Sequence, residues 1–147
     1  MRIAVGSDHA GFEPPPPLYK PSVIAHLERL GHEVIDCGTD GPDSVDYPDY
    51  AEKVCQALLT GQADRGVLIC GTGIGVGIAA NRHKGIRAAP CTMPEAARLS
   101  REHNDANVLC LGRRLLTLEE CLEILDVWLS TSFSEGERHI RRIKKLG

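Results

Sequence analysis

The segment Cys70–Gly77, with the sequence CGTGIGVG, combines a thiol with glycines at alternate positions. Such glycines let backbone amides point into a concavity at the start of a helix, where they can bind a phosphate or an oxyanion. A thiolate beside that cradle could act as a nucleophile or as a base. The alternative is that the glycines serve close helix–sheet packing and that Cys70 is a core residue. The position of the thiol at the edge of the cradle favours the functional interpretation.

The same segment does not match the common nucleotide-binding patterns. Val76 and Ile78 fall where G-x-G-x-x-G requires its third glycine, and no Gly-Lys-Ser/Thr follows. A dinucleotide site and a P-loop are therefore not predicted.

Other groups with useful chemistry are spread along the chain. Asp8 and His9 follow an apolar segment, and His103 ends a candidate helix, although these residues could equally be turn and helix-capping residues. Arg138 and Arg142 are four residues apart, so they share a helix face and could grip a phosphate together. For their basic neighbours, a solvated surface is the favoured interpretation.

Alternating apolar and amphipathic segments define the elements that must position these groups. Short apolar runs predict strands at Arg2–Ser7, Glu33–Cys37, Arg65–Cys70, Ile86–Ala89 and Asn107–Leu111. Helical periodicity and start signals predict helices at Ser22–Leu30, Pro48–Thr60, Ile74–Asn81, Pro94–His103, Leu118–Ser130 and Glu135–Leu146. This alternation predicts a parallel sheet covered by helices on both faces. Ligands bind at the carboxyl ends of such strands, so Asp8, His9, the Cys70 loop and Arg113–Arg114 are expected around one crevice.

The run Pro14–Pro21, with the sequence PPPPLYKP, stands where the first helix would otherwise begin. Consecutive prolines cannot form a helix interior, because they lack the amide hydrogen and clash with the preceding turn. We therefore expect a loop over residues 14–21, at the mouth of the crevice, and a helix that begins near Pro21–Ser22. The run is too short to separate domains, so residues 1–147 are expected to form one domain.

Composition argues against several classes of function. The net charge of −3 and the pI of about 6.1 give no support for binding to nucleic acid or to an anionic membrane. The sequence shows no signal peptide pattern and no apolar stretch long enough to span a membrane. The six cysteines are widely spaced, and outside Cys70 they are interpreted as buried, reduced core residues. A cytoplasmic protein is expected.

Several motifs, in order along nearly the whole chain, resemble type B ribose-5-phosphate isomerases, whose superfamily also contains allose-6-phosphate and galactose-6-phosphate isomerases. The motifs are GSDHAGF at Gly6–Phe12, DYP at Asp46–Pro48, ICGTGIG at Ile69–Gly75, AAN at Ala79–Asn81, SREHNDAN at Ser100–Asn107 and ERH at Glu137–His139. The resemblance implies a Rossmann-like three-layer α/β/α sandwich with a five-stranded parallel sheet in the order 2-1-3-5-4. It also implies a homodimer, or a dimer of such dimers, with active sites shared between subunits and with neither a metal nor an organic cofactor.

The implied reaction is the interconversion of ribose 5-phosphate and ribulose 5-phosphate in the pentose phosphate pathway, through an enediolate. Cys70 would be the base, His103 would assist ring opening and Asp8 would move protons between oxygens. The loop residues Gly71, Thr72, Gly73, Ile74 and Gly75 would surround the enediolate, with Tyr47 lining the sugar pocket. The phosphate would be held by His9, Arg114, Arg138 and Arg142, with Asn104 nearby.

Two alternatives remain open at this point. A six-carbon aldose 6-phosphate would need more room beyond C5, although Cys70 disfavours the galactose-6-phosphate type of subunit that lacks this thiol. A non-catalytic sugar-phosphate-binding module would need the arginines and glycines but not Cys70, His103 and Asp8. The chain also departs from the family in its proline run and in its short final helix.

Overall fold

The computed structural model describes residues 1–147 and contains one five-stranded parallel sheet. The strand order is β2-β1-β3-β5-β4, which confirms the expected topology. In the register of the two central strands, Cys70 lies opposite Gly112. The strands are β1 (Arg2–Ser7), β2 (Glu33–Asp36), β3 (Arg65–Cys70), β4 (Ala88–Pro90) and β5 (Val108–Gly112).

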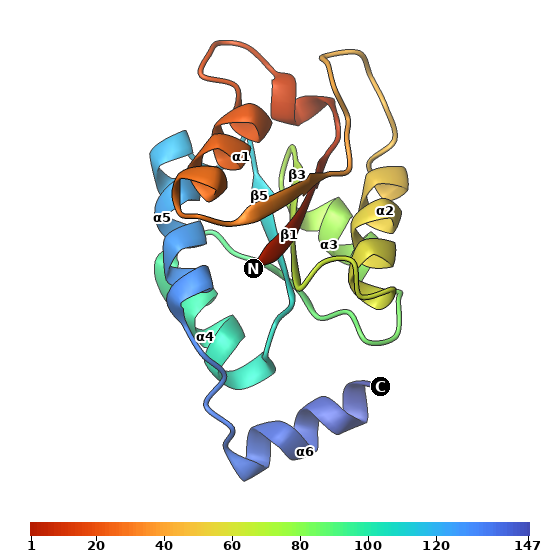
Figure 1. The fold of residues 1–147 in the computed structure, drawn as a ribbon, viewed down its shortest axis with the longest axis vertical. Coiled ribbons are helices and arrows are strands. Elements are labelled where there is room, and N and C mark those ends of the chain that lie inside the picture. Colours follow the sequence, from red (N-terminus) through yellow and green to blue (C-terminus); the bar gives the residue numbers. More distant parts are fainter.

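Helices cover both faces of the sheet, as alternating strands and helices predict (Figure 1). One face carries α1 (Tyr19–Arg29), α4 (Pro94–Asn104) and α5 (Leu118–Ser130), and the other carries α2 (Tyr47–Leu59) and α3 (Ile74–Ala80). A short 3-10 helix, η1 (His9–Phe12), follows β1. A capping box begins α5, because the side chains of Thr117 and Glu120 each accept a hydrogen bond from the other's backbone amide. Trp128 of α5 is fully buried in the core of its face.

The first helix begins earlier than the sequence predicted. It starts at Tyr19 rather than near Pro21, so the loop ends at Leu18 instead of extending to residue 21. Pro21 fits in the first turn because the amides there have no partner within the helix. Tyr19 is buried, and its hydroxyl donates a 2.6 Å hydrogen bond to the carbonyl oxygen of Leu116. This tertiary anchor draws the helix start towards the proline run.

The fourth strand also differs from its predicted position. It covers Ala88–Pro90 instead of Ile86–Ala89. The amide of Ile86 donates to the carbonyl of His83 at 3.1 Å, so Ile86 belongs to a turn, not to the sheet. The strand prediction at Ile86 was therefore wrong. Its β-branched side chain in a short apolar run favours a strand, and the sequence pattern does not reveal the hydrogen bond of this turn.

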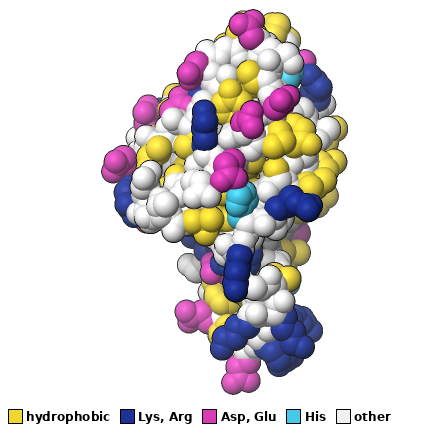
Figure 2. Space-filling view, turned by 90° about the vertical axis from the view of Figure 1, so that its right-hand side faces the viewer, with side chains coloured by type: hydrophobic (Ala, Val, Ile, Leu, Met, Phe, Trp, Pro, Cys, Tyr) yellow, Lys and Arg dark blue, Asp and Glu magenta, His cyan; other side chains and the backbone are white.

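The last helix, α6 (Glu137–Leu146), lies apart from the sheet, at the bottom of Figure 1. Its nearest neighbour is α4, and the preceding segment is fastened there by the Ser134 hydroxyl, which donates to the carbonyl of Glu102 at 2.6 Å. Figure 2 shows lysine and arginine side chains gathered on this protruding end. None of the helices has the length and hydrophobicity that crossing a membrane requires.

Candidate active site

The Cys70 side chain ends β3 at the carboxyl edge of the sheet and is buried. Its sulfur accepts a hydrogen bond from the amide of Gly73 at 3.1 Å. Gly73 has φ of +76°, a left-handed conformation that glycine adopts without strain and that starts α3. The loop backbone therefore holds the sulfur at the start of α3.

The amides of this loop divide into two groups. Those of Gly73 and Ile74 are occupied, since Gly73 donates to Cys70 and Ile74 donates to the Thr72 hydroxyl oxygen at 3.2 Å. Those of Gly71, Thr72 and Gly75 have no acceptor within the chain. The unbonded amides are free to bind an oxyanion.

Backbone contacts join the Cys70 loop to the segment that follows β5. The amide of Arg113 donates to the carbonyl of Cys70 at 2.9 Å, and the amide of Arg114 donates to that of Gly71 at 2.8 Å. The two segments approach so closely at Gly112 that an added Cβ would lie 2.6 Å from the backbone of Thr72. The position of the loop is thus fixed by main-chain contacts.

The Arg114 side chain lies over this loop. A Cβ on Gly71 would be 3.1 Å from Nη1 of Arg114, so the guanidinium covers that glycine. The Nε atom of Arg114 donates to both carboxylate oxygens of Glu13, at 3.2 and 3.3 Å. The hydrogen bond and charge of Glu13 raise the pKa of Arg114, and the nearby Asp8 and Cys70 raise it further. Arg114, Cys70 and Asp8 therefore lie close together at the carboxyl edge of the sheet.

Asp8 and His9 follow β1 at the same edge. Asp8 is buried, and its Oδ1 accepts from the amide of Ala10 at 2.9 Å, which caps η1. The Nδ1 atom of His9 accepts from the amide of Val45 at 3.2 Å. An amide can only donate, so the proton of the neutral imidazole is on Nε2. That tautomer can donate a hydrogen bond to an anionic oxygen.

Tyr47 completes this group from the start of α2. A Cβ on Gly75 would lie 2.8 Å from the Tyr47 ring, so the ring packs directly on the glycine. Tyr47 and Ile74 are both exposed. The structure thus brings together, at the carboxyl edge, the predicted site residues Asp8, His9, Tyr47, Cys70, Gly71, Thr72, Gly73, Ile74, Gly75 and Arg114.

The other predicted residues lie at the opposite edge of the sheet. His103 and Asn104 end α4, which runs back to the amino end of β5, and Arg138 and Arg142 are exposed on α6. Within one chain, none of these four residues joins the Cys70 group, and the two edges are at the top and bottom of Figure 1.

His103 stacks on His139, with ring centroids 4.4 Å apart and ring planes inclined by 13°. Burial lowers the pKa of His139, and His103, Arg138 and Arg142 lower it further. The two rings, with Arg138 and Glu102, line a hollow of about 510 Å³. This end of the molecule therefore carries a second, separate group of polar residues.

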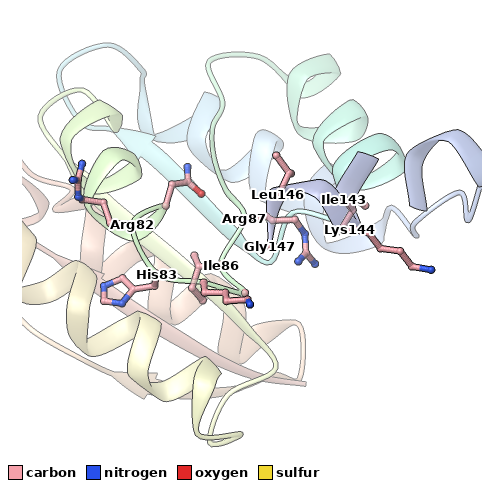
Figure 3. Close-up of a pocket in the computed structure, with 11 residues that line it drawn as sticks. Arg82, His83, Ile86, Arg87, Ile143, Lys144, Leu146 and Gly147 are labelled. Carbon is pink, nitrogen blue, oxygen red and sulfur yellow. The ribbon is translucent and has the colours of Figure 1, made fainter. Parts of the chain in front are cut away.

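A hollow of about 500 Å³ between residues 81–87 and the end of α6 is lined by cations but lacks convergent groups. The Arg87 guanidinium donates hydrogen bonds to the carbonyls of Asn104 and Asp105, and His83 is paired with Glu52. Figure 3 shows the side chains of Arg82 and Lys144 pointing away from each other. This hollow contains none of the predicted site residues.

Comparison with known proteins decides the family. The model of the Ribose/Galactose Isomerase family matches residues 3–146. The chain belongs to the ribose/galactose isomerase family.

Relatives within this family extend over nearly the whole chain. Ribose-5-phosphate isomerase B of Escherichia coli is 47% identical over 145 residues, which cover 99% of this chain and 93% of that protein. The structure of ribose-5-phosphate isomerase B from Clostridium thermocellum has a TM-score of 0.94 and 50% identity, with coverage of 100% and 95%. A ribose 5-phosphate isomerase structure from Thermotoga maritima gives a TM-score of 0.92 and 52% identity, with coverage of 99% and 96%.

Sequence reasoning missed two residues that contact predicted site residues, and a third that fixes a loop beside the site. Glu13 binds Arg114, and His139 stacks on His103. Lys20 is buried, pairs with Asp36 and donates to the carbonyl of Thr39 at 2.8 Å, which fixes the loop before α2. His139 stands in the ERH motif, which was a usable signal. No sequence pattern indicates the partners of Glu13 and Lys20.

Proposed function

We propose that this protein is an aldose–ketose isomerase that interconverts ribose 5-phosphate and ribulose 5-phosphate through an enediolate. Family membership and relatives named ribose-5-phosphate isomerase B support the reaction. The observation that carries the proposal is the buried Cys70 sulfur, bound by the Gly73 amide and bordered by unbonded amides and Arg114. Such a site provides a base, an oxyanion cradle and a cation for a phosphate.

The reaction needs one proton to move between adjacent carbons. The Cys70 thiolate removes the proton from C2 of the open-chain aldose, and the electron pair of that bond forms the enediolate. The resulting thiol returns a proton to C1, which gives the ketose. Asp8, which is buried at the same edge of the sheet, carries a proton from O2 to O1. General acid–base steps of this kind contribute about 10²–10⁴ in rate.

The negative charge of the enediolate requires preorganised donors. The amides of Gly71, Thr72 and Gly75 are suited to this role, because Gly73 and Ile74 have partners within the loop. His9 and Arg114 hold the phosphate, which supplies binding energy for orientation. Tyr47, on Gly75, lines the sugar pocket.

We further propose that a second copy of the chain supplies His103, Asn104, Arg138 and Arg142, in a homodimer with shared sites. His103 then assists ring opening and the two arginines complete the phosphate site. Support comes from the topology, which puts these residues at the edge away from Cys70, and from α6, which protrudes with Arg138 and Arg142 exposed. The free cysteines fit a reducing cytoplasm, and membership of the family supports an enzyme of the pentose phosphate pathway.

Replacement of Cys70 tests the base. We expect Cys70→Ala to lower kcat for ribose 5-phosphate at least about a hundredfold, because it removes the base. The loss should extend to exchange of the C2 hydrogen with solvent. Cys55→Ala is the matched control, since Cys55 is buried in the same core cluster but lies outside the site. A folded Cys70→Ala protein that retains turnover would eliminate Cys70 as the base.

The substrate is tested by comparing kcat/KM for ribose 5-phosphate, allose 6-phosphate and galactose 6-phosphate. The proposal expects the five-carbon sugar to be preferred. A preference for a six-carbon sugar would overturn the assigned substrate while leaving the reaction class intact. Binding of all three without isomerisation or C2 exchange would overturn the enzyme itself and support a binding module.

A further inference from the structure

The proline run is fastened at both ends to the segment that carries Arg114. On its amino side, the Arg113 guanidinium donates to the carbonyls of Glu13 and Pro14 at 3.3 and 3.4 Å. On its carboxyl side, the same guanidinium lies 4.3 Å over the Tyr19 ring, and the Tyr19 hydroxyl donates to Leu116. The exposed Pro14–Pro17 thus span a gap between two fixed points.

Glu13 lies at the start of this span and contacts Arg114, the residue proposed to bind the phosphate. Its amide donates to the carbonyl of Ala10 at 3.2 Å, which fixes its backbone at the end of η1. Both of its carboxylate oxygens lie on the Nε side of Arg114. The Nη1 atom of that guanidinium remains over Gly71, on the side of the Cys70 loop.

Glu13 binds the Nε side of the Arg114 guanidinium and leaves the Nη side free, which suggests a role for Glu13. Arg114 is exposed, and a free arginine side chain samples many rotamers, which costs binding free energy when a ligand fixes it. A carboxylate that occupies Nε limits those rotamers and leaves the Nη groups available for a phosphate. Prolines in the adjoining loop limit backbone freedom in the same way, because each fixes its φ.

We infer that Glu13 and the Pro14–Pro17 run form a strap that positions Arg114 for the phosphate group of the sugar substrate. Glu13 is a positioning residue, because it acts through Arg114 and needs no contact with the sugar. The inference rests on the proposed function for the identity of the substrate. In this arrangement the loop sets the affinity for the phosphate and leaves the chemical step unaffected.

The test separates KM from kcat. Glu13→Ala should raise KM for ribose 5-phosphate about fivefold and leave kcat unchanged, because the strap affects binding before the chemistry. Glu13→Gln, which keeps an acceptor for Nε but not the charge, should fall between wild type and Glu13→Ala. Replacing Pro14–Pro17 by four glycines should also raise KM for ribose 5-phosphate. Glu28→Ala removes the same charge from the surface of α1 and should leave KM unchanged.

A double-mutant cycle makes the test specific. In an Arg114→Ala background, Glu13→Ala should have no further effect, because its action passes through Arg114. The same cycle, measured as calorimetric binding of inorganic phosphate, does not depend on turnover. An unchanged or lower KM in Glu13→Ala, or equal effects with and without Arg114, would overturn the strap. An inactive wild-type protein that still binds phosphate in a Glu13-dependent manner would overturn only the proposed function.

Discussion

At the scale of single residues, the site depends on one close main-chain approach. Gly112 ends β5 opposite Cys70, and Thr72 passes over it with no room for a side chain. The nearest atoms to an added Cβ are backbone carbon and oxygen of Thr72, at 2.6 Å. The residues on either side of Thr72 are hydrogen-bonded, Gly71 through its carbonyl and Gly73 through its amide, so this backbone cannot rotate away as a flexible side chain can. Gly112 therefore fixes where the loop sits.

We expect Gly112→Ala to damage the site and the fold together. Relief of the clash must displace the Cys70 loop, and overpacking of this kind costs about 1–3 kcal/mol of unfolding free energy. Urea unfolding and kcat measured on the same sample check both effects. Gly41→Ala serves as the control, because its Cβ would meet nothing within 4 Å. A Gly112→Ala protein with wild-type stability and turnover would show that the loop is not held by this contact.

At the scale of elements, α6 is attached to the body through groups that titrate. His139 is buried against His103, while Arg138 and Arg142 are nearby on its own helix. Glu102 of α4 and Glu137 of α6 line the same hollow. Protonation of His139 would place a poorly solvated cation beside other cationic or protonatable groups. The attachment is consequently strongest when this ring is neutral.

The lowered pKa of His139 determines how the free energy of unfolding changes with pH. The pKa of His139 lies below its ordinary value of 6.5, so near and below that pH the unfolded chain binds more protons than the folded one. The contribution of His139 to stability is therefore fully present above pH 6.5 and is lost as the pH falls from 6.5 through the lower pKa of the folded state. His32, whose pKa is lowered mainly by burial, acts in the same direction.

We expect the Tm of the wild type to fall between pH 7 and pH 5, and that of His139→Phe to fall less, because phenylalanine keeps the stacking but has no titrating group. Calorimetry at both pH values measures the difference. Hydrogen exchange of α6 should show that part of the acid sensitivity is local. Identical pH profiles for the two proteins would contradict the assignment to His139.

Most elements were predictable because their signals are local. Apolar runs located the central strands, and Thr117 with Glu120 gave the start of α5. The start of α1 was missed because it depends on the Tyr19–Leu116 hydrogen bond, which joins residues distant in the sequence. The gathering of Asp8, Cys70 and Arg114 at one edge could be predicted because parallel strands end there. The partners of Glu13 and Lys20 could not, since tertiary packing alone brings them together.

At the scale of the whole molecule, the proposed site is divided between the two ends of each chain. The base and the oxyanion cradle are at one edge, and His103 with the paired arginines is at the other. A sheet of fixed topology cannot bring the edges together, so the proposed site requires a neighbouring copy to complete it. Ile74 and Ile78 of α3 are exposed and offer apolar area for such a contact. Hydrophobic side chains are visible on this side of the molecule in Figure 2.

Complementation between inactive variants tests the divided site. Cys70→Ala lacks the base at one edge, and His103→Ala lacks the ring-opening group at the other, so each homodimer should be nearly inactive. In a hybrid dimer, one of the two sites receives both mutant residues and the other receives both native ones. Random mixing makes about half of the dimers hybrids, each with one native site, so about a quarter of wild-type activity should return. Dissociating and refolding the mixed chains, followed by the ribose 5-phosphate assay, measures this recovery. Two copies of the same variant, treated identically, provide the control. A mixture that exchanges subunits but remains inactive would place Cys70 and His103 in one chain's site and refute the shared arrangement.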